Sequence, residues 1–220
     1  MRLHTAALFA AAAVLFTGCA NISVNVTVPG KNLSGSYDEA VSTSEESEAD
    51  YLGILPDHVR EISTEGCDTF TQIVDRVLTQ GQGYANVRLG DTDVLAVAGA
   101  TFSGYGEDAA VDAEIFRYAD DGTIEYLGYL QCGGTANPLA VKDGMVYTAG
   151  HHYVGKHTVT DGKLVTIEEA WETYDGSRTF CRTYSDGKES VSEGSEADAA
   201  YSRLFDECFG ADIIAFDTIK

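Results

Sequence analysis

Basic residues are scarce in this chain of 220 residues: 14 Lys and Arg stand against 35 Asp and Glu, a formal net charge of −21. So negative a protein is repelled by phosphate backbones, and we expect no nucleic-acid partner. Anionic lipid surfaces would repel it as well. Any attachment to a membrane therefore needs a device other than electrostatic attraction.

Long apolar runs are missing too. The longest, residues 6–16, covers about eleven residues, whereas a helix that spans a bilayer needs roughly 20. It follows Arg2 and has the anatomy of a secretory signal peptide. The chain also lacks a P-loop, a dinucleotide-binding fingerprint, Gly-x-Ser-x-Gly, HExxH and Cys-x-x-Cys, so no motif indicates an enzyme class.

The signal is followed by the string Leu15-Phe16-Thr17-Gly18-Cys19. This string resembles the lipobox of bacterial lipoproteins, although Phe16 stands where that family usually has Leu. The resemblance implies cleavage before Cys19 by signal peptidase II and a diacylglycerol on its thiol. We therefore expect an exported protein that Cys19 anchors to the bacterial cell membrane. The alternative is an ordinary cleaved signal with an incidental cysteine.

Three parts follow from this interpretation: a signal peptide at 1–18, a tether at 19–50 and one domain at 51–220. The tether is rich in Ser, Thr, Asn and Glu, and Lys31 is its only base. Such a segment buries too little apolar surface to offset its ordering entropy. We expect it to hold the domain away from the membrane.

Two amphipathic helices are expected in the domain. The first carries an apolar stripe, with Thr69 and Gln72 as a capping box and Gly81 as the stop. The second has Ser195 as its cap and Gly210 at its end. The stripe residues are Phe70, Ile73, Val74, Val77 and Leu78 in the first helix, and Ala197, Ala200, Tyr201, Leu204, Phe205 and Cys208 in the second.

Short β segments fill the region between the helices. They are expected near 84–89, 93–102, 111–118, 123–130, 139–142, 145–149, 154–160, 163–174 and 177–184, and a final strand near 213–219. Asp-Gly pairs begin at 121, 143, 161, 175 and 186, and this dipeptide is typical of hairpin turns. The fold class predicted is α+β: an antiparallel up-and-down β-meander, either a curved sheet or a partial barrel, packed by the two helices.

Alternate connections of a meander emerge at the same end of the sheet. The three long connections, 103–110, 131–138 and 150–155, should therefore share one end, where binding residues concentrate. The candidate ligand-binding residues on these loops are Tyr105, Glu107, Asp108, Gln131, Thr135, Asn137, His151, His152 and Tyr153.

Two catalytic alternatives use the same end. His151, His152 and His157 with Glu107 or Asp108 could hold a metal ion, but adjacent histidines in a strand point to opposite faces. Cys132 with a histidine could act as a thiol hydrolase. Four cysteines remain besides Cys19 (Cys67, Cys132, Cys181 and Cys208), and an even count in an exported protein favours at least one disulfide.

The function expected from the sequence is a lipid-anchored extracytoplasmic binding module without a cofactor or resident metal. Its ligand could be a glycan, a small molecule or a protein. The alternatives are a metal-dependent or thiol hydrolase at the same loop end, or a structural or regulatory envelope protein without a small ligand.

Overall fold

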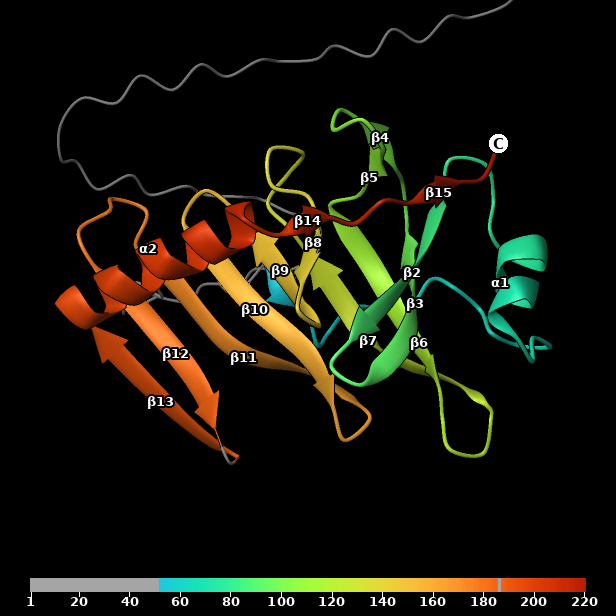
Figure 1. Ribbon diagram of the computed structural model, residues 1–220, viewed down its shortest axis with the longest axis horizontal. Helices are drawn as coiled ribbons and strands as arrows, with labels where there is room; N and C mark the ends of the chain where they lie inside the picture. Colours follow the sequence, from blue (N-terminus) through green and yellow to red (C-terminus); the bar gives the residue numbers. More distant parts are fainter. Residues whose placement is uncertain (1–51, 186) are drawn as a thin grey trace, which may run out of the picture. The chain divides into compact units, whose positions relative to one another are not determined.

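The computed structural model describes residues 52–185 and 187–220. The predicted signal peptide, the Cys19 anchor, the tether, and the single positions Tyr51 and Asp186 lie outside this range. The described chain is mostly antiparallel β-sheet with two helices, as predicted (Figure 1). Its strands form a six-stranded sheet, a seven-stranded sheet and a short two-stranded ribbon.

The six-stranded sheet has the order β1-β7-β6-β3-β2-β15. Four of its strands, β2, β3, β6 and β7, pair with their neighbours in chain order, as a meander requires. The bounds are β1 Gly53–Ile54, β2 Gly83–Leu89, β3 Thr92–Ala98, β6 Asp112–Tyr118, β7 Ile124–Gln131 and β15 Asp217–Thr218. The ribbon of β4 (Phe102–Ser103) and β5 (Asp108–Ala109) is inserted between β3 and β6.

The seven-stranded sheet has the order β13-β12-β11-β10-β9-β8-β14, and its first six members are again a meander. The bounds are β8 Ala140–Lys142, β9 Met145–Ala149, β10 Tyr153–Thr160, β11 Lys163–Glu172, β12 Thr179–Ser185, β13 Lys188–Glu193 and β14 Asp212–Ile213. A register shift between Lys156 and His157 interrupts the pairing of β10 with β11.

The division into two sheets differs from the single sheet expected, and burial explains it. The core strand β3 is apolar on both faces and is covered on both. Val94 and Ala96 belong to a core cluster shared with Val146 and Leu164 of the other sheet, while Leu95 lies in a second cluster on the opposite face. Because both faces need cover, the meander splits into layers that can pack on each other.

Helix α1 (Phe70–Arg76) lies beside the six-stranded sheet, and Ile73 packs in the cluster with Leu95 and Phe116. Thr69 is its N-cap, as predicted, and accepts a hydrogen bond from the Gln72 amide. The Gln72 side chain, however, accepts from the N–H of Asp68 and does not close the capping box on Thr69. The helix ends earlier than predicted, at Arg76, so Gly81 is not its stop.

Helix α2 (Ser195–Phe209) lies along the seven-stranded sheet (Figure 1). Three residues of its predicted apolar face, Ala197, Leu204 and Cys208, are buried in one cluster with Ala170 of β11 and Cys181 of β12. Gly210 ends the helix as expected. The prediction for Ser195 is wrong: Gly194 is the N-cap, with φ +75 and no side-chain cap, and Ser195 is the first helical residue.

The expected final strand at 213–219 is in fact two short strands in different sheets. β14 pairs with β8, and β15 pairs with β2. Between them, Ile214 donates to the Leu139 carbonyl and Phe216 to the Asp108 carbonyl. This C-terminal segment, 212–219, therefore joins the edges of the two sheets.

The Asp-Gly turns are confirmed where they are described. Gly122, Gly144, Gly162 and Gly176 have φ between +66 and +83, a region that favours glycine, and each follows the predicted strand. Strand β13, which follows Gly187, was not predicted. Its six side chains are almost all exposed, so it has no apolar alternation to read. No helix within the described ranges is long and apolar enough to cross a membrane.

Candidate functional site

The three long loops lie together at one end of the domain, as the order of the strands predicts. The Tyr105 hydroxyl, on the turn between β4 and β5, donates to the Thr135 carbonyl at 2.8 Å. The amide of Gly133 donates to the Ala149 carbonyl, also at 2.8 Å. Ala149 ends β9, and the next residue, Gly150 of the third loop, also lies against Gly133, so the second loop contacts both the first and the third. A common loop end is therefore a property of the fold.

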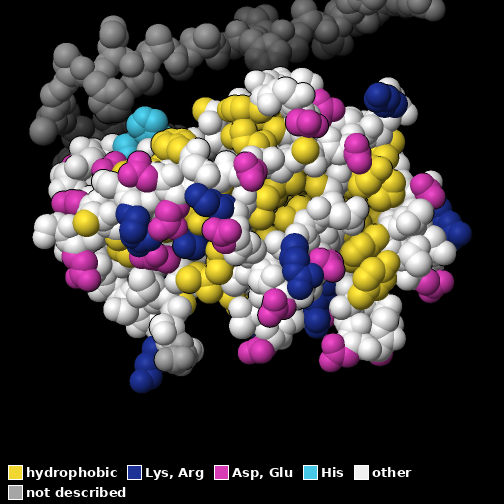
Figure 2. Space-filling model, in the orientation of Figure 1, with side chains coloured by type: hydrophobic (Ala, Val, Ile, Leu, Met, Phe, Trp, Pro, Cys, Tyr) yellow, Lys and Arg dark blue, Asp and Glu magenta, His cyan; other side chains and the backbone are white. Residues whose placement is uncertain are grey.

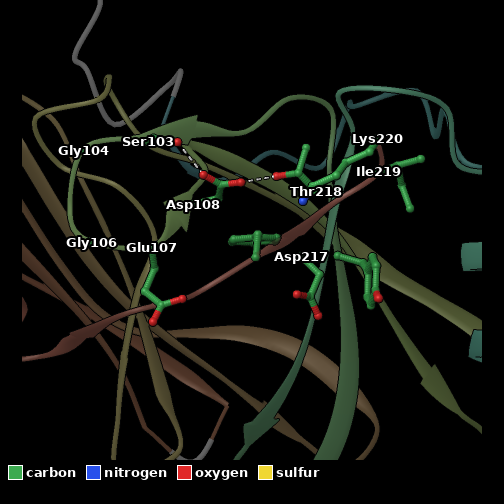
Figure 3. A pocket seen from close by; sticks show the side chains of 11 residues that line it. Ser103, Gly104, Gly106, Glu107, Asp108, Asp217, Thr218, Ile219 and Lys220 are labelled. Atoms are coloured by element: carbon green, nitrogen blue, oxygen red, sulfur yellow. Dashed lines mark hydrogen bonds between the residues drawn. The ribbon is translucent and has the colours of Figure 1, made fainter.

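The main cavity at this end is a groove of about 980 Å³ between the β4–β5 ribbon and the C-terminal segment (Figure 3). One wall is formed by residues 103–108 and the other by residues 216–220, with Tyr84 of β2 beside them. Two predicted residues, Glu107 and Asp108, line it. The lining residues are Tyr84, Ser103, Gly104, Gly106, Glu107, Asp108, Phe216, Asp217, Thr218, Ile219 and Lys220.

Asp108 ties the two walls together. Its Oδ1 accepts from the Ser103 hydroxyl at 2.5 Å and its Oδ2 from the Thr218 hydroxyl at 2.6 Å, so both oxygens are occupied (Figure 3). Because these bonds favour the charged form, they hold the pKa of the Asp108 carboxyl below its ordinary value. Asp108 is thus an ionised brace of the groove, and each of its two oxygens accepts one hydrogen bond from a wall.

Glu107 and Asp217 present the carboxylates that are left. Both side chains are exposed. In Figure 3 their carboxylates are drawn below that of Asp108. Within the described ranges neither has a hydrogen-bond or ion-pair partner. They come from opposite walls of the groove, whose single basic side chain is that of Lys220. With Asp108 ionised, the groove presents a negative surface beside Phe216 and Tyr84. Figure 2 shows acidic side chains next to hydrophobic ones over the β4–β5 ribbon.

His151 and His152 lie outside this groove, in a cluster of their own. The expectation that they point apart is wrong, because both lie in a bend before β10 and not in the strand. The His151 Nδ1 and the His152 Nε2 are 2.7 Å apart, and the other ring nitrogen of His152 is 3.3 Å from Glu172. Tyr174 packs against the His152 ring.

Two residues named in the sequence analysis prove to be internal. Tyr153 is fully buried and its hydroxyl donates to Glu169, so it cannot contact a ligand at the rim. His157 is also fully buried, where its ring nitrogens lie 2.7 Å from the Thr148 hydroxyl and 3.0 Å from that of Thr166. Burial lowers the pKa of His157 to about 3, which keeps the ring neutral.

The remaining predicted residues, Gln131, Thr135 and Asn137, lie on the second loop and do not line the groove. The Gln131 amide is engaged by its neighbours: it accepts from Tyr129 and donates to the Cys132 carbonyl. The backbone N–H of Asn137 donates to the Gly134 carbonyl in the loop turn. Thr135 is exposed, and its carbonyl receives the Tyr105 hydroxyl.

The four cysteines of the domain are free thiols, contrary to the expected disulfide. Three of them pack in the core as small apolar side chains. Cys132 lies in the cluster between the two sheets, and Cys181 and Cys208 lie in the cluster beneath α2. Burial raises the pKa of Cys132 to about 12, which disfavours the thiolate that a nucleophile needs. Within the described part of the chain, no group of three His, Cys, Asp or Glu residues is placed to hold a metal ion.

Half of the groove was missed by the sequence analysis. Asp217 and Thr218 are predicted to lie in a final strand at 213–219, and Lys220 is given no role. A predicted strand carries no information on its partners, so none of the three is linked to the loop end. The signal that places these residues is the pairing of β15 with β2, which only the folded chain provides.

Comparison with known proteins gives no further assignment: no protein-family model matches the chain, and neither does any curated protein.

Proposed function

We propose that this protein is a lipid-anchored extracytoplasmic binding module whose ligand-binding site is the loop-end groove. Cys19 supplies the membrane anchor, residues 19–50 the tether, and the helix-packed, partly closed β-meander a rigid frame for the loops. Each acyl methylene buried in a bilayer contributes about 0.8 kcal/mol, enough in several chains to hold an acidic protein at a membrane.

The observation that carries the proposal is the groove itself, of about 980 Å³, with the unpaired carboxylates of Glu107 and Asp217 on its two walls. Carboxylates beside aromatic rings suit a ligand that combines a positive charge with an apolar part. The ligand class proposed is therefore a cationic small molecule or a basic segment of a protein, in preference to a neutral glycan.

Catalysis at this end is not part of the proposal. The thiol alternative requires a reactive Cys132, which is buried with a raised pKa. The metal alternative joins histidines to Glu107 or Asp108, but His151 and His152 do not line the groove that holds these carboxylates. His157 is enclosed between two threonines inside the domain.

A thermal-stability screen of the full chain tests the binding proposal. The panel contains diamines, lysine-rich peptides, acidic peptides and neutral oligosaccharides. A ligand that binds only the folded state adds about 2.7 kcal/mol of stability at one hundred times its Kd. We expect a saturable rise in Tm with a cationic probe.

The variant Glu107→Gln with Asp217→Asn should abolish that rise. A matched control, Glu65→Gln with Asp120→Asn, removes two exposed carboxylates elsewhere and should keep it. Stabilisation by acidic or neutral probes alone would refute the cationic class. A panel without any effect, or an effect that survives in the groove variant, would refute the site.

The anchor is tested by cell fractionation. The change Cys19→Ser removes the thiol that carries the lipid, so the protein should move from the membrane fraction to the soluble fraction. A control, Cys67→Ser, changes a cysteine of the domain and should leave the protein with the membrane. Unchanged fractionation of the Cys19→Ser protein contradicts the anchor without affecting the binding proposal.

A further inference from the structure

The segment that leads from β1 to α1 crosses the outer face of the six-stranded sheet without forming a helix or a strand of its own. At its start, the Leu55 amide donates to the Tyr129 carbonyl at 3.1 Å. Further on, Ile62 is buried in the cluster that contains Ile73 of α1. Between these points Val59 is 82% exposed, so residues 58–62 touch the sheet at few places.

Besides the buried Ile62 side chain, the carboxylate of Glu114 on β6 holds this stretch to the sheet. Glu114 is only 3% exposed, yet it carries a carboxylate. Its oxygens accept from the backbone amides of Glu61 and Ile62, the latter at 3.1 Å, and the His58 Nε2 lies 3.2 Å away. All hydrogen-bond partners that the structure records for this carboxylate, in the ranges it describes, thus belong to residues 58–62.

The His58 ring adds a flat contact. It stacks on Tyr129 of β7 with the ring centroids 3.6 Å apart and an angle of 5° between the planes. A cavity of about 150 Å³ lies beneath the segment. Its floor includes Asp112, whose Oδ1 accepts from the Gly99 amide at 3.1 Å.

We infer that residues 58–62 are a latch, keyed by Glu114, that opens as a unit while both sheets stay folded. Opening breaks the three contacts to one carboxylate, one ring stack and the packing of the Ile62 side chain, but no strand ladder. It also gives Glu114 access to water, so the charge is compensated in both the closed and the open state. Local openings of this kind are expected where few contacts hold a segment.

The open latch would expose Asp112, Glu114 and Tyr129 together on the outer face of the six-stranded sheet. This surface is distinct from the loop-end groove, so the inference goes beyond the proposed function and does not depend on it. Closed, the latch keeps two carboxyl groups and a phenol under cover, and burial accordingly raises the pKa of Asp112.

Hydrogen exchange of the full chain, followed by mass spectrometry, tests the latch. The change Glu114→Gln keeps one acceptor oxygen but removes the charge and the second acceptor. Charge-assisted bonds are the stronger ones, so exchange of the Glu61 and Ile62 amides should become about tenfold faster or more. Exchange in β3 and β6 should stay as in the unchanged protein.

A matched control is Glu125→Gln on β7, which removes a carboxylate paired with Arg117 and should leave residues 58–62 unaffected. A second variant, His58→Ala, weakens the latch from its own side without changing the sheet, and should give the same local acceleration. Cleavage by trypsin after Arg60 provides an independent readout and should become faster in both latch variants.

Two results would overturn the inference. Equal acceleration in residues 58–62 and in the strands would mean that the segment opens only when the domain unfolds. Unchanged exchange in both latch variants would mean that Glu114 and His58 do not hold the segment closed.

Discussion

Lowering the pH should destabilise the domain through His157, a fully buried residue outside the groove. An unfolded histidine has a pKa of about 6.5, whereas the fold lowers the pKa of His157 to about 3 by enclosing the ring. Because the folded pKa is the lower one, the unfolded chain takes up the proton first. The contribution of His157 is complete above pH 6.5 and is lost progressively toward pH 3.

The size of the effect follows from these two values. At pH 5 an unfolded imidazole is mostly protonated while the buried one stays neutral, which costs about 2 kcal/mol relative to pH 7. The ring itself is held between the hydroxyls of Thr148 and Thr166. Glutamine can make both hydrogen bonds but does not titrate, so His157→Gln should remove this pH dependence.

Urea unfolding of the full chain at pH 7, 6 and 5 measures it. The single tryptophan, Trp171, is buried against Phe180, so its fluorescence reports unfolding. Between pH 7 and 5 the unchanged protein should lose about 2 kcal/mol more than the His157→Gln variant. A control, His151→Gln, alters an exposed ring and should retain the full loss. An equal loss in the His157→Gln variant would refute the reasoning.

Three further predictions concern thiols, a loop contact and the groove. In the folded protein a thiol reagent should modify Cys67, which is partly exposed. The other three, Cys132, Cys181 and Cys208, should react only after unfolding, because each is buried and has a raised pKa of about 11 or 12. Equal labelling of all four in the folded protein would contradict this packing. Gly133→Ala should lower Tm markedly, because a Cβ there would lie 2.7 Å from the Gly150 Cα, a backbone atom that cannot rotate away. The comparison is Gly176→Ala, where φ is +66 and the space around the new Cβ is open, so any loss of Tm there reports backbone strain without a clash. Thr218→Val removes one donor to Asp108 and should raise the pKa of that carboxyl toward its ordinary value in an NMR titration, and an unchanged titration would show that the bond across the groove does not form in solution.

Much of the fold is written locally in the chain. Asp143 and Asp161 have φ of 51 and 50, and each is followed by a glycine with positive φ, the backbone that a tight hairpin requires. Such pairs predict hairpins, and a succession of hairpins determines which loops lie at the same end of the sheet. The contact between Tyr105 and Thr135 could therefore be anticipated without coordinates.

What could not be predicted depends on contacts between distant segments. Tyr153 sits at the edge of a loop in the sequence, but packing against Gly53, about one hundred residues earlier, encloses it. The groove needs Asp217 opposite Glu107, and nothing near either residue indicates the other. Strand β13 has no apolar face, so it forms because β12 offers it an edge.

The C-terminal segment also implies an order of assembly. Synthesis begins at the N-terminus, so all the remaining strands are made before β14 and β15. Until then β8 and β2 are unpaired edge strands, which can pair with strands of other molecules. The pairing of β14 with β8 and of β15 with β2 therefore forms after the other pairings of the two sheets, and until it forms these two edges can template aggregation.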